Sequence, residues 1–438
     1  MKNNTLNLPW GKNKITFDLP PTWQVEGTLE PAALAGVANL DKELQRSLQA
    51  PIECQQLSKL VNKNSHIALV MDDLSRPTPV SKLLPAVLNE LKRGGVTPSQ
   101  ITLIPALGVH RPMEQKEIAQ RAGQKFLLGL HWENPNCGSS EKLVYLGKTS
   151  RGVPVYVDKN VASADVVVSI GCIEPHIIAS FGGGYKNLFP GVAGRETIAQ
   201  NHSLNATPDT FNMVGQPIEK NPMRLDLEES GQMLKKPVFI INAVLNSHLE
   251  VVRIVCGDPI AAHREGAKVS AQIYGVKIPA SADIVITNSY PMETDLRQGV
   301  KALANTIRAV RRGGTLITLV RAEEGVGVFG LAERKLPVGR NGLKILMPLL
   351  LVILPKIKLK GLGEEDRFFL YFALQAMHHC EMIMYAPSIP VEIQSRLPFV
   401  SFVGSPEEAV KRAQARHGQQ ANVLVFPLGG ITYPILDK

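Results

Sequence analysis

The chain has 438 residues, of which 44% are hydrophobic and 20% are charged, and its formal net charge is +9. This length is too great for one ordinary core, and the balance of residues predicts a globular protein of two domains, with three as the alternative. The five cysteines form no CxxC pair, so neither a disulfide framework nor a cysteine zinc site is indicated, and reduced thiols are favoured.

No membrane span is expected. The polar N-terminus lacks the apolar core of a signal peptide, and the longest apolar run, 345–354, is far shorter than the roughly 20 residues that a membrane helix needs. We therefore expect a cytoplasmic protein in which this run forms a buried element. A membrane contact is the alternative, because the stretch 344–360 also contains Lys344, Lys356, Lys358 and Lys360.

The positive charge is spread along the chain. It forms no basic run and no motif of basic and aromatic residues, so no nucleic-acid partner is expected. A small anionic substrate and a phosphorylated cofactor fit the same charge.

Apolar segments alternate with amphipathic ones through the first part of the chain. The pattern predicts strands over 66–71, 101–106, 165–170, 238–244 and 251–256. Helices are predicted over 82–93, which stops at a pair of glycines, and over 259–273. Alternation of this kind predicts a parallel sheet with helices on both faces.

A second series of the same kind begins near residue 282. It predicts strands over 283–287, 315–320 and 423–426, and helices over 298–311, 364–378 and 407–417. The best candidate linker is 277–280. The expected fold is therefore α/β, with two domains of mainly parallel sheets: residues 1–276, completed by 420–438, and residues 281–418.

Three polar clusters directly follow predicted strands, at 72–79, 108–113 and 171–191. Ligands bind at the carboxyl ends of parallel strands, so these clusters are expected to share one cleft. Arg76, on a proline-stiffened loop, suits a carboxylate or a phosphate, although a solvated turn is an equally good interpretation. His110 suits proton transfer near neutral pH, although a structural histidine is the commoner case.

The third cluster contains Glu174-Pro175-His176 and then three glycines that precede Lys186. Consecutive glycines predict a surface of exposed backbone N–H groups that suits a phosphate; a flexible loop is the alternative. The spacing here is neither a Walker A motif nor GxGxxG, which argues against a conventional dinucleotide dehydrogenase. His202, taken alone, would be an ordinary histidine.

A fourth cluster, 290–301, lies at the start of a predicted helix. Gln298 and Lys301 are three residues apart and share a face, where an amide and a lysine could close over an anionic substrate. A solvated helix face is the alternative. HExxH and GxSxG motifs are absent, which weakens the zinc protease and serine hydrolase interpretations.

Taken in this order, the clusters resemble the nickel-dependent lactate racemase family. The most specific elements are HRPM at 110–113, PH at 175–176, FGGGYK at 181–186, PG at 190–191 and the histidine at 202. The resemblance runs from Asp72 to the helix after Gln298. It implies two α/β domains with the active site in the cleft between them, and a racemase or epimerase of a small 2-hydroxy acid.

The resemblance also implies a cofactor, the nickel-pincer nucleotide, which is a pyridinium-3,5-bisthiocarboxylic acid mononucleotide nickel complex. His202 matches the nickel ligand, and Lys186 matches a lysine that is joined covalently to the cofactor. His110 and His176 match the two histidines that act in turn as acid and base around a hydride transfer. The implied cofactor contacts are Asp73, Leu74, Ser75, Arg76, Gly182, Gly183 and Gly184, and the implied substrate contacts are Arg76, Gln298 and Lys301.

The chain departs from the family pattern at Asp295 and Arg297, where the family carries asparagine and an aromatic residue. Arg297 would admit a second carboxylate or a polar tail, so lactate is one candidate substrate among several. Cofactor-synthesis enzymes are expected as transient partners. A non-catalytic binder or carrier of the nickel nucleotide is the alternative function, because it would retain His202 and Lys186. The sequence leaves the oligomeric state open.

Overall fold

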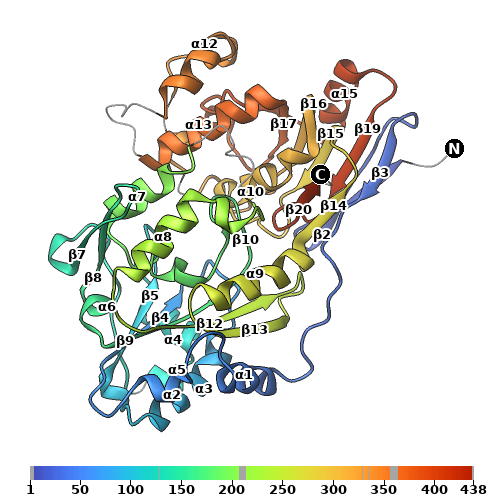
Figure 1. The fold of residues 1–438 in the computed structure, drawn as a ribbon. Helices are drawn as coiled ribbons and strands as arrows, with labels where there is room; N and C mark the ends of the chain where they lie inside the picture. The colour runs from blue at the N-terminus through green and yellow to red at the C-terminus, as the bar shows by residue number, and fades with distance from the viewer. Residues whose placement is uncertain are drawn as a thin grey trace.

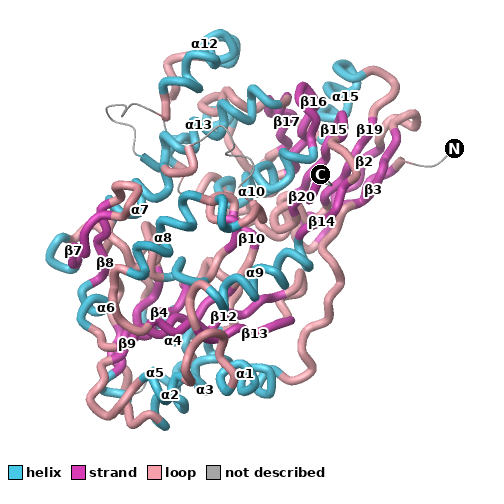
Figure 2. The backbone as a smooth tube through the Cα atoms, viewed as in Figure 1, coloured by secondary structure: helices cyan, strands magenta, loops and turns pink. Residues whose placement is uncertain are grey.

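Two six-stranded sheets organise the molecule (Figures 1 and 2). The computed structural model describes residues 4–127, 129–206, 214–327, 329–333, 335–355 and 364–436. Every neighbouring pair in the two sheets is parallel except one, which confirms the expected α/β class with mainly parallel sheets.

The first sheet is built from the middle of the chain. In spatial order its strands are β13 (Val251–Gly257), β12 (Val238–Leu245), β9 (Val166–Cys172), β4 (Ile67–Asp72), β5 (Ile101–Ala106) and β6 (His131–Trp132). Only β13 runs antiparallel to its neighbour. All residues of β4 and β9 are buried, as continuous apolar strands between two helical layers should be.

Helices cover both faces of this sheet. On one face pack α1 (Leu40–Gln49), α2 (Leu57–Leu60), α3 (Val80–Arg93) and α4 (Gln115–Ala122). On the other face pack α6 (Lys159–Ser163), α7 (Arg195–Ser203), α8 (Pro222–Gln232) and α9 (Ala261–Tyr274). Local signals set the ends of these helices: α4 begins with a capping box between Glu114 and Glu117 and ends at Gly123.

The second sheet combines strands from both ends of the chain. In spatial order they are β18 (Ser401–Val403), β17 (Glu381–Tyr385), β16 (Val310–Leu319), β15 (Ala282–Asn288), β19 (Asn422–Phe426) and β3 (Gln24–Thr28). One face packs against α10 (Leu296–Thr306), α12 (Arg340–Ile353) and α13 (Glu364–His379). The other face packs against α15 (Pro406–His417) and the hairpin of β1 (Thr5–Trp10) and β2 (Asn13–Asp18).

Short elements complete the fold. They are α5 (Gln124–Leu127), the hairpin of β7 (Leu143–Lys148) and β8 (Pro154–Asp158), β10 (Pro175–His176) with β11 (Ser180–Phe181), β14 (Gly275–Ile278) with β20 (Tyr433–Leu436), α11 (Gly330–Glu333) and α14 (Val391–Gln394). Among the described residues, no helix is both long enough and apolar enough to cross a membrane.

Most of the predicted elements are found within a few residues of their expected bounds. All five strands of the first series and all three of the second are present. The helix predicted over 298–311 ends at Thr306, because strand β16 already begins at Val310. The N-terminal strands, the β7–β8 hairpin and β17 were not expected from the sequence.

Two of the sequence expectations about the domain boundaries need correction. The candidate linker 277–280 begins inside strand β14, which pairs with β20. The segment 420–438 was grouped with the first domain, but its strand β19 lies in the second sheet between β15 and β3. The N-terminal strand β3, also grouped with the first domain, belongs to the same sheet. The division of the chain near residues 276–281 otherwise stays a prediction.

The apolar run 345–354 was expected to be buried, and this is wrong for much of it. It lies in α12, which projects from the top of the molecule in Figure 1. Leu343 and Met347 are buried on one face of the helix, whereas Ile345 is 79% exposed. Leu349 and Val352 are also exposed. One helical face is enough to anchor α12 on α13, so the remaining apolar residues face outward. Residues 356–360 lie outside the described residues.

Candidate active site

The three polar clusters of the first series meet at one edge of the first sheet. Strands β4, β5 and β9 are adjacent and parallel, with Asp72 opposite Ala106 and Met71 opposite Ile170. The chain segments that follow these strands therefore emerge side by side. They bring Asp73 and Arg76, then His110, and then His176 to the wall of a single cavity of about 160 Å³.

His110 is held by a carboxylate. Its Nδ1 lies 2.6 Å from a carboxyl oxygen of Asp73, and the other oxygen of Asp73 accepts hydrogen bonds from the backbone N–H and the hydroxyl of Ser75. Burial would raise the pKa of Asp73, but the hydrogen bond and charge of His110, with Ser75 and Arg76, lower it to about 2. The carboxylate therefore accepts Nδ1–H from the ring and leaves Nε2 of His110 as the proton acceptor.

His176 is held in the opposite way. Its Nδ1 accepts hydrogen bonds from the backbone N–H groups of Ile178, at 3.3 Å, and Ala179, at 3.1 Å. In the neutral ring the hydrogen must then sit on Nε2. Burial, followed by the positive charges of Lys186 and Arg76, lowers the pKa of His176 well below its usual value. The two histidines of the cavity thus present unlike nitrogens, one with a lone pair and one with a hydrogen.

Arg76 is oriented by a residue that the sequence did not single out for a role. Its guanidinium forms an ion pair with Glu174, which follows strand β9 two residues before His176. Burial alone would lower the pKa of Arg76, but the charge of Glu174 raises it above its usual value. Arg76 therefore stays a fixed cation in the wall of the cavity, suited to a carboxylate or phosphate.

The glycine loop is shaped from beneath by a buried arginine. Arg224 of α8 has no solvent exposure, and its guanidinium donates to the carbonyl oxygens of Ala179, Phe181 and Gly183. Gly183 and Gly184 have φ angles of 74° and 63°, a region that favours glycine. Arg224 thus helps to fix the backbone conformation between His176 and Lys186.

The glycines do not form the expected surface of exposed N–H groups. The N–H of Gly182 donates to the carbonyl of Glu174, and that of Gly184 donates to the side chain of Asn242. All three glycines are buried, and a Cβ on Gly183 would lie 2.8 Å from the Asn242 oxygen. Close packing is the reason for glycine here, and the cofactor contacts assigned to Gly182, Gly183 and Gly184 stay predictions.

The second series supplies the opposite wall through α10. Arg297, Gln298 and Lys301 of this helix line the same cavity. The helix begins at Asp295, whose side chain caps the backbone N–H of Gln298 at 2.8 Å. The three residues fall on consecutive turns of one face, so all of them point toward the first sheet.

His202 reaches the cavity from α7. This helix packs against α13, whose Phe368 and Phe369 also line the cavity. Within the described residues, neither ring nitrogen of His202 forms a hydrogen bond. Burial, then the charges of Lys186 and Arg297, lower the pKa of His202 to about 3. The ring is therefore neutral and able to donate a lone pair to a metal.

Two lysines of the cavity have pKa values below that of an ordinary lysine. Burial, then Arg76 and Arg224, lower the pKa of Lys186 to about 7. Burial, then Arg76, lower the pKa of Lys301 to about 8. A carboxylate or a phosphate placed among these groups would relieve the repulsion, so the site is electrostatically prepared for an anionic ligand.

The low pKa of Lys186 predicts unusual reactivity. The amine should be half neutral near pH 7, and about 90% neutral at pH 8, where an ordinary lysine is almost fully charged. Acylation of Lys186 by acetic anhydride, followed by peptide mass spectrometry, should therefore rise with a midpoint near pH 7. Nα-acetyllysine is the reference. Phosphate should move the midpoint upward, and a midpoint near pH 10 without phosphate would contradict the expectation.

The cavity gathers most of the residues that the sequence singled out. Asp73, Ser75, Arg76, His110, His176, Lys186, His202, Gln298 and Lys301 all line it, whereas Leu74 and the three glycines do not. Leu74 is 42% exposed and lies in a neighbouring depression. Residues that were not expected also line the cavity, notably Asn187 and the two phenylalanines of α13.

Two further observations concern metal and dinucleotide binding. Among the described residues, no group of three or more histidine, cysteine, aspartate or glutamate side chains is placed to hold a metal ion by itself. A GxGxxG spacing does occur at 325–330 and was overlooked in the sequence. It follows β16 but leads into α11, a helix of only four residues, so it lacks the long helix of a dinucleotide-binding unit.

Comparisons with known proteins agree on one relationship. A family model described as the lactate racemase N-terminal domain matches residues 10–212. The chain is 28% identical to the lactate racemase of Thermoanaerobacterium thermosaccharolyticum over 329 residues, which are 74% of this chain and 76% of that protein. It is 26% identical to the lactate racemase of Lactiplantibacillus plantarum, over 97% of this chain and 98% of that protein.

Solved structures show the same likeness. The structure of the lactate racemase apoprotein from Thermoanaerobacterium thermosaccharolyticum matches with a TM-score of 0.84 at 25% identity, and the match covers 98% of this chain and 100% of that chain. A crystal structure of a protein from Thermotoga maritima has a TM-score of 0.65 at 16% identity, covers 93% of this chain and 100% of that chain, and shares the fold.

Proposed function

We propose that the chain is a member of the lactate racemase family and inverts the hydroxyl-bearing carbon of a small 2-hydroxy acid, because it is similar to lactate racemases over most of its length. The observation that carries the proposal is the pairing of two unlike histidines in one cationic cavity. His110 offers a lone pair on Nε2, and His176 offers a hydrogen on Nε2. Inversion at a carbon needs such groups on both faces of the reacting centre.

The residues of the cavity fit the nickel-pincer nucleotide that the family implies. His202 is a neutral imidazole without a protein partner in the described part of the chain, so its ring would supply a nitrogen ligand to the nickel. Arg76 and Lys186 would meet the nucleotide phosphate. Lys186, with a pKa of about 7, has the neutral amine that covalent attachment would require. When bound, this nucleotide would supply the pyridinium ring that accepts a hydride, which no side chain can do.

Side chains of the protein would hold the substrate and move its proton. Arg76 and Lys301 would bind the carboxylate, so that only the hydroxyl-bearing carbon changes its geometry. His110 would take the hydroxyl proton on Nε2 while Asp73 stabilises the resulting imidazolium. After the planar keto acid has rotated, its oxygen would lie against Nε2–H of His176 and regain a proton there. His110 would release the proton that it took, and His176 would replace the one that it gave, both by exchange with solvent, so that each turnover leaves the two rings as they began.

The direct test is a chiral assay of protein produced together with the cofactor-synthesis enzymes. Chiral chromatography should show interconversion of the two enantiomers of at least one 2-hydroxy acid. The alternative, a carrier of the nucleotide, predicts full cofactor loading with no interconversion across lactate, malate and longer acids. A protein that interconverts enantiomers without bound nickel would exclude the proposed chemistry.

The assignment of His202 as nickel ligand makes a separate prediction. His202→Ala should reduce bound nickel from about one per chain to less than a tenth of that, measured by elemental analysis of protein produced with the cofactor-synthesis enzymes. His66→Ala is the control, because His66 is exposed and lies at the opposite end of strand β4. Intact-mass measurement of the wild-type protein should show an added mass, and peptide mass spectrometry should locate it on Lys186. Unchanged nickel in His202→Ala would remove this residue from the site.

A further inference from the structure

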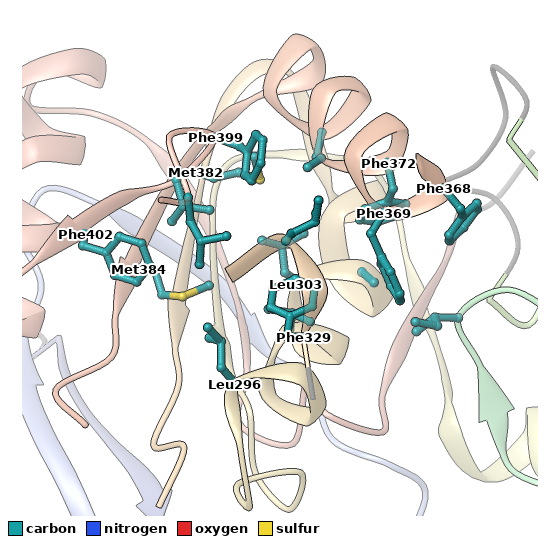
Figure 3. Close-up of a pocket in the computed structure, with 18 of the residues that line it drawn as sticks. Leu296, Leu303, Phe329, Phe368, Phe369, Phe372, Met382, Met384, Phe399 and Phe402 are labelled. Atoms are coloured by element: carbon teal, nitrogen blue, oxygen red, sulfur yellow. The ribbon is translucent and has the colours of Figure 1, made fainter. Parts of the chain in front are cut away.

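A second cavity lies next to the polar one and is entirely apolar. It has a volume of about 80 Å³, and all of the residues that line it are aliphatic, aromatic or methionine (Figure 3). Side chains of α10, α13 and strands β17 and β18 converge around it, among them Leu303, Phe372, Met384 and Phe402. Protein interiors are close-packed, so a space of this size among apolar side chains is typical of a ligand site.

The two cavities share a wall. Ile177, Ile178, Phe368 and Phe369 line both of them. Ile177 directly follows His176, so the shared wall begins next to one of the two histidines. The polar site and the apolar space therefore adjoin each other at these four side chains.

Helix α10 serves both cavities with alternate residues. Leu296 and Val300 face the apolar space, whereas Arg297, Gln298 and Lys301 face the polar one. A molecule whose carboxylate lies against Lys301 would therefore have an apolar surface within one helical turn of its charged end.

We propose that the apolar cavity receives the side chain of the substrate, and that the substrate is a 2-hydroxy acid with a branched aliphatic or aromatic side chain. This inference rests on the proposed function, because it uses the same carboxylate and histidine contacts. Three of the four substituents of the reacting carbon are the carboxylate, the hydroxyl group and the hydrogen that leaves. The fourth has to point away from the cations, and the apolar cavity shares four lining residues with the site.

Size distinguishes this substrate from lactate. A cavity of roughly 150 Å³ holds benzene in a protein core, and the apolar cavity here has about half that volume, which the methyl group of lactate would not fill. Contacts with a remote part of the substrate can raise kcat/KM by holding the reacting carbon in place. The Arg297 side chain favours a polar tail instead, and that alternative is an outcome of the test.

The first arm of the test uses the cofactor-loaded wild-type enzyme. Initial rates of enantiomer interconversion are compared for lactate, 2-hydroxybutanoate, 2-hydroxy-4-methylpentanoate, 3-phenyllactate and malate. We expect kcat/KM to rise by about fourfold for each buried methylene group, or about 60-fold for the three additional carbons from lactate to 2-hydroxy-4-methylpentanoate. Equal or falling values along this series, or malate as the best substrate, would overturn the inference.

The second arm fills the cavity. Ala304 of α10 is 6% exposed and lines only the apolar space. Ala304→Phe should lower kcat/KM for 2-hydroxy-4-methylpentanoate by at least tenfold and leave that for lactate within twofold. Nickel content and the urea midpoint of unfolding show whether the variant is folded and loaded. An equal loss for both substrates in a folded, loaded variant would contradict a side-chain site.

The third arm separates this inference from the proposed function. Calorimetry measures binding of two keto acids, 4-methyl-2-oxopentanoate and pyruvate, to protein that has not been loaded with cofactor. Binding of the larger acid at least tenfold more tightly supports the apolar site even if no enantiomer is ever interconverted, an outcome that would remove only the proposed function. Equal binding of the two acids overturns the inference even if the enzyme is an active racemase.

Discussion

Replacing His176 by alanine should lower kcat for interconversion by about 10²–10⁴-fold, the usual contribution of a positioned acid or base. The ring of His176 is fixed by two backbone N–H groups, so no neighbouring side chain can take over its Nε2–H. His110→Ala should cause a loss of the same order, because Asp73 then has no imidazole to orient. Rates are measured by chiral chromatography with the best substrate of the series.

Two measurements distinguish the loss of an acid or base from a general disruption of the site. Nickel content should stay at the wild-type level in both variants, because neither histidine is the proposed ligand. His131→Ala, at an exposed position on strand β6, is the matched control and should keep full activity. The equilibrium constant of a racemisation is one, so kcat/KM has to fall by the same factor in both directions. If either single variant keeps wild-type kcat, the scheme with two histidines is wrong.

Replacing Arg224 by leucine should lower the free energy of unfolding by about 3 kcal/mol. The guanidinium is the partner of three buried carbonyl groups, and each carbonyl left unpaired costs about 1 kcal/mol or more. Leucine fills much of the space and offers no donor, so water cannot easily replace the lost contacts. Urea unfolding followed by circular dichroism gives the change.

The same substitution should also reduce cofactor loading. Arg224 lies under the chain segment that joins His176 to Lys186. In the variant, that segment loses the three hydrogen bonds that hold its carbonyl groups in place. Arg412→Leu is the control, because Arg412 forms only an exposed helical ion pair with Glu408, worth about 0.5 kcal/mol or less. A change below about 1 kcal/mol in Arg224→Leu would mean that the segment is held by other contacts.

The residues brought together by neighbouring strands could be predicted from the sequence. Arg76, His110 and His176 each follow an apolar strand, and parallel strands end at one edge of a sheet, so a shared cleft followed from local patterns alone. The predicted helix start at Gln298 and Lys301 was also sufficient to place these two side chains on one face. Family resemblance then added His202 and Lys186, which no spacing rule would have selected.

Contacts between segments distant in the sequence could not be predicted. Glu174 pairs with Arg76 across 98 residues, and Phe368 of α13 reaches the cavity from a helix far along the chain. The interpretation of the glycines failed for a related reason: Asn242 and Arg224, which occupy their polar groups, come from elements far along the chain. The exposure of α12 could not be predicted either, because an apolar run does not show how many faces of the helix pack against other elements.

The path of the chain between the two sheets has a mechanical consequence. The backbone passes through the second sheet at β3, leaves it to build the whole first sheet, and returns at β15, so the sheets are joined by two covalent connections instead of one. Figure 1 shows the first connection as the long blue segment between β3 and α1. Two covalent connections restrict the twisting of one sheet against the other. They leave mainly a hinge motion about the line that joins the two connections. Opening of the cleft to admit a substrate should therefore be a hinge motion, in which α10 moves as a rigid body relative to His110 and His176.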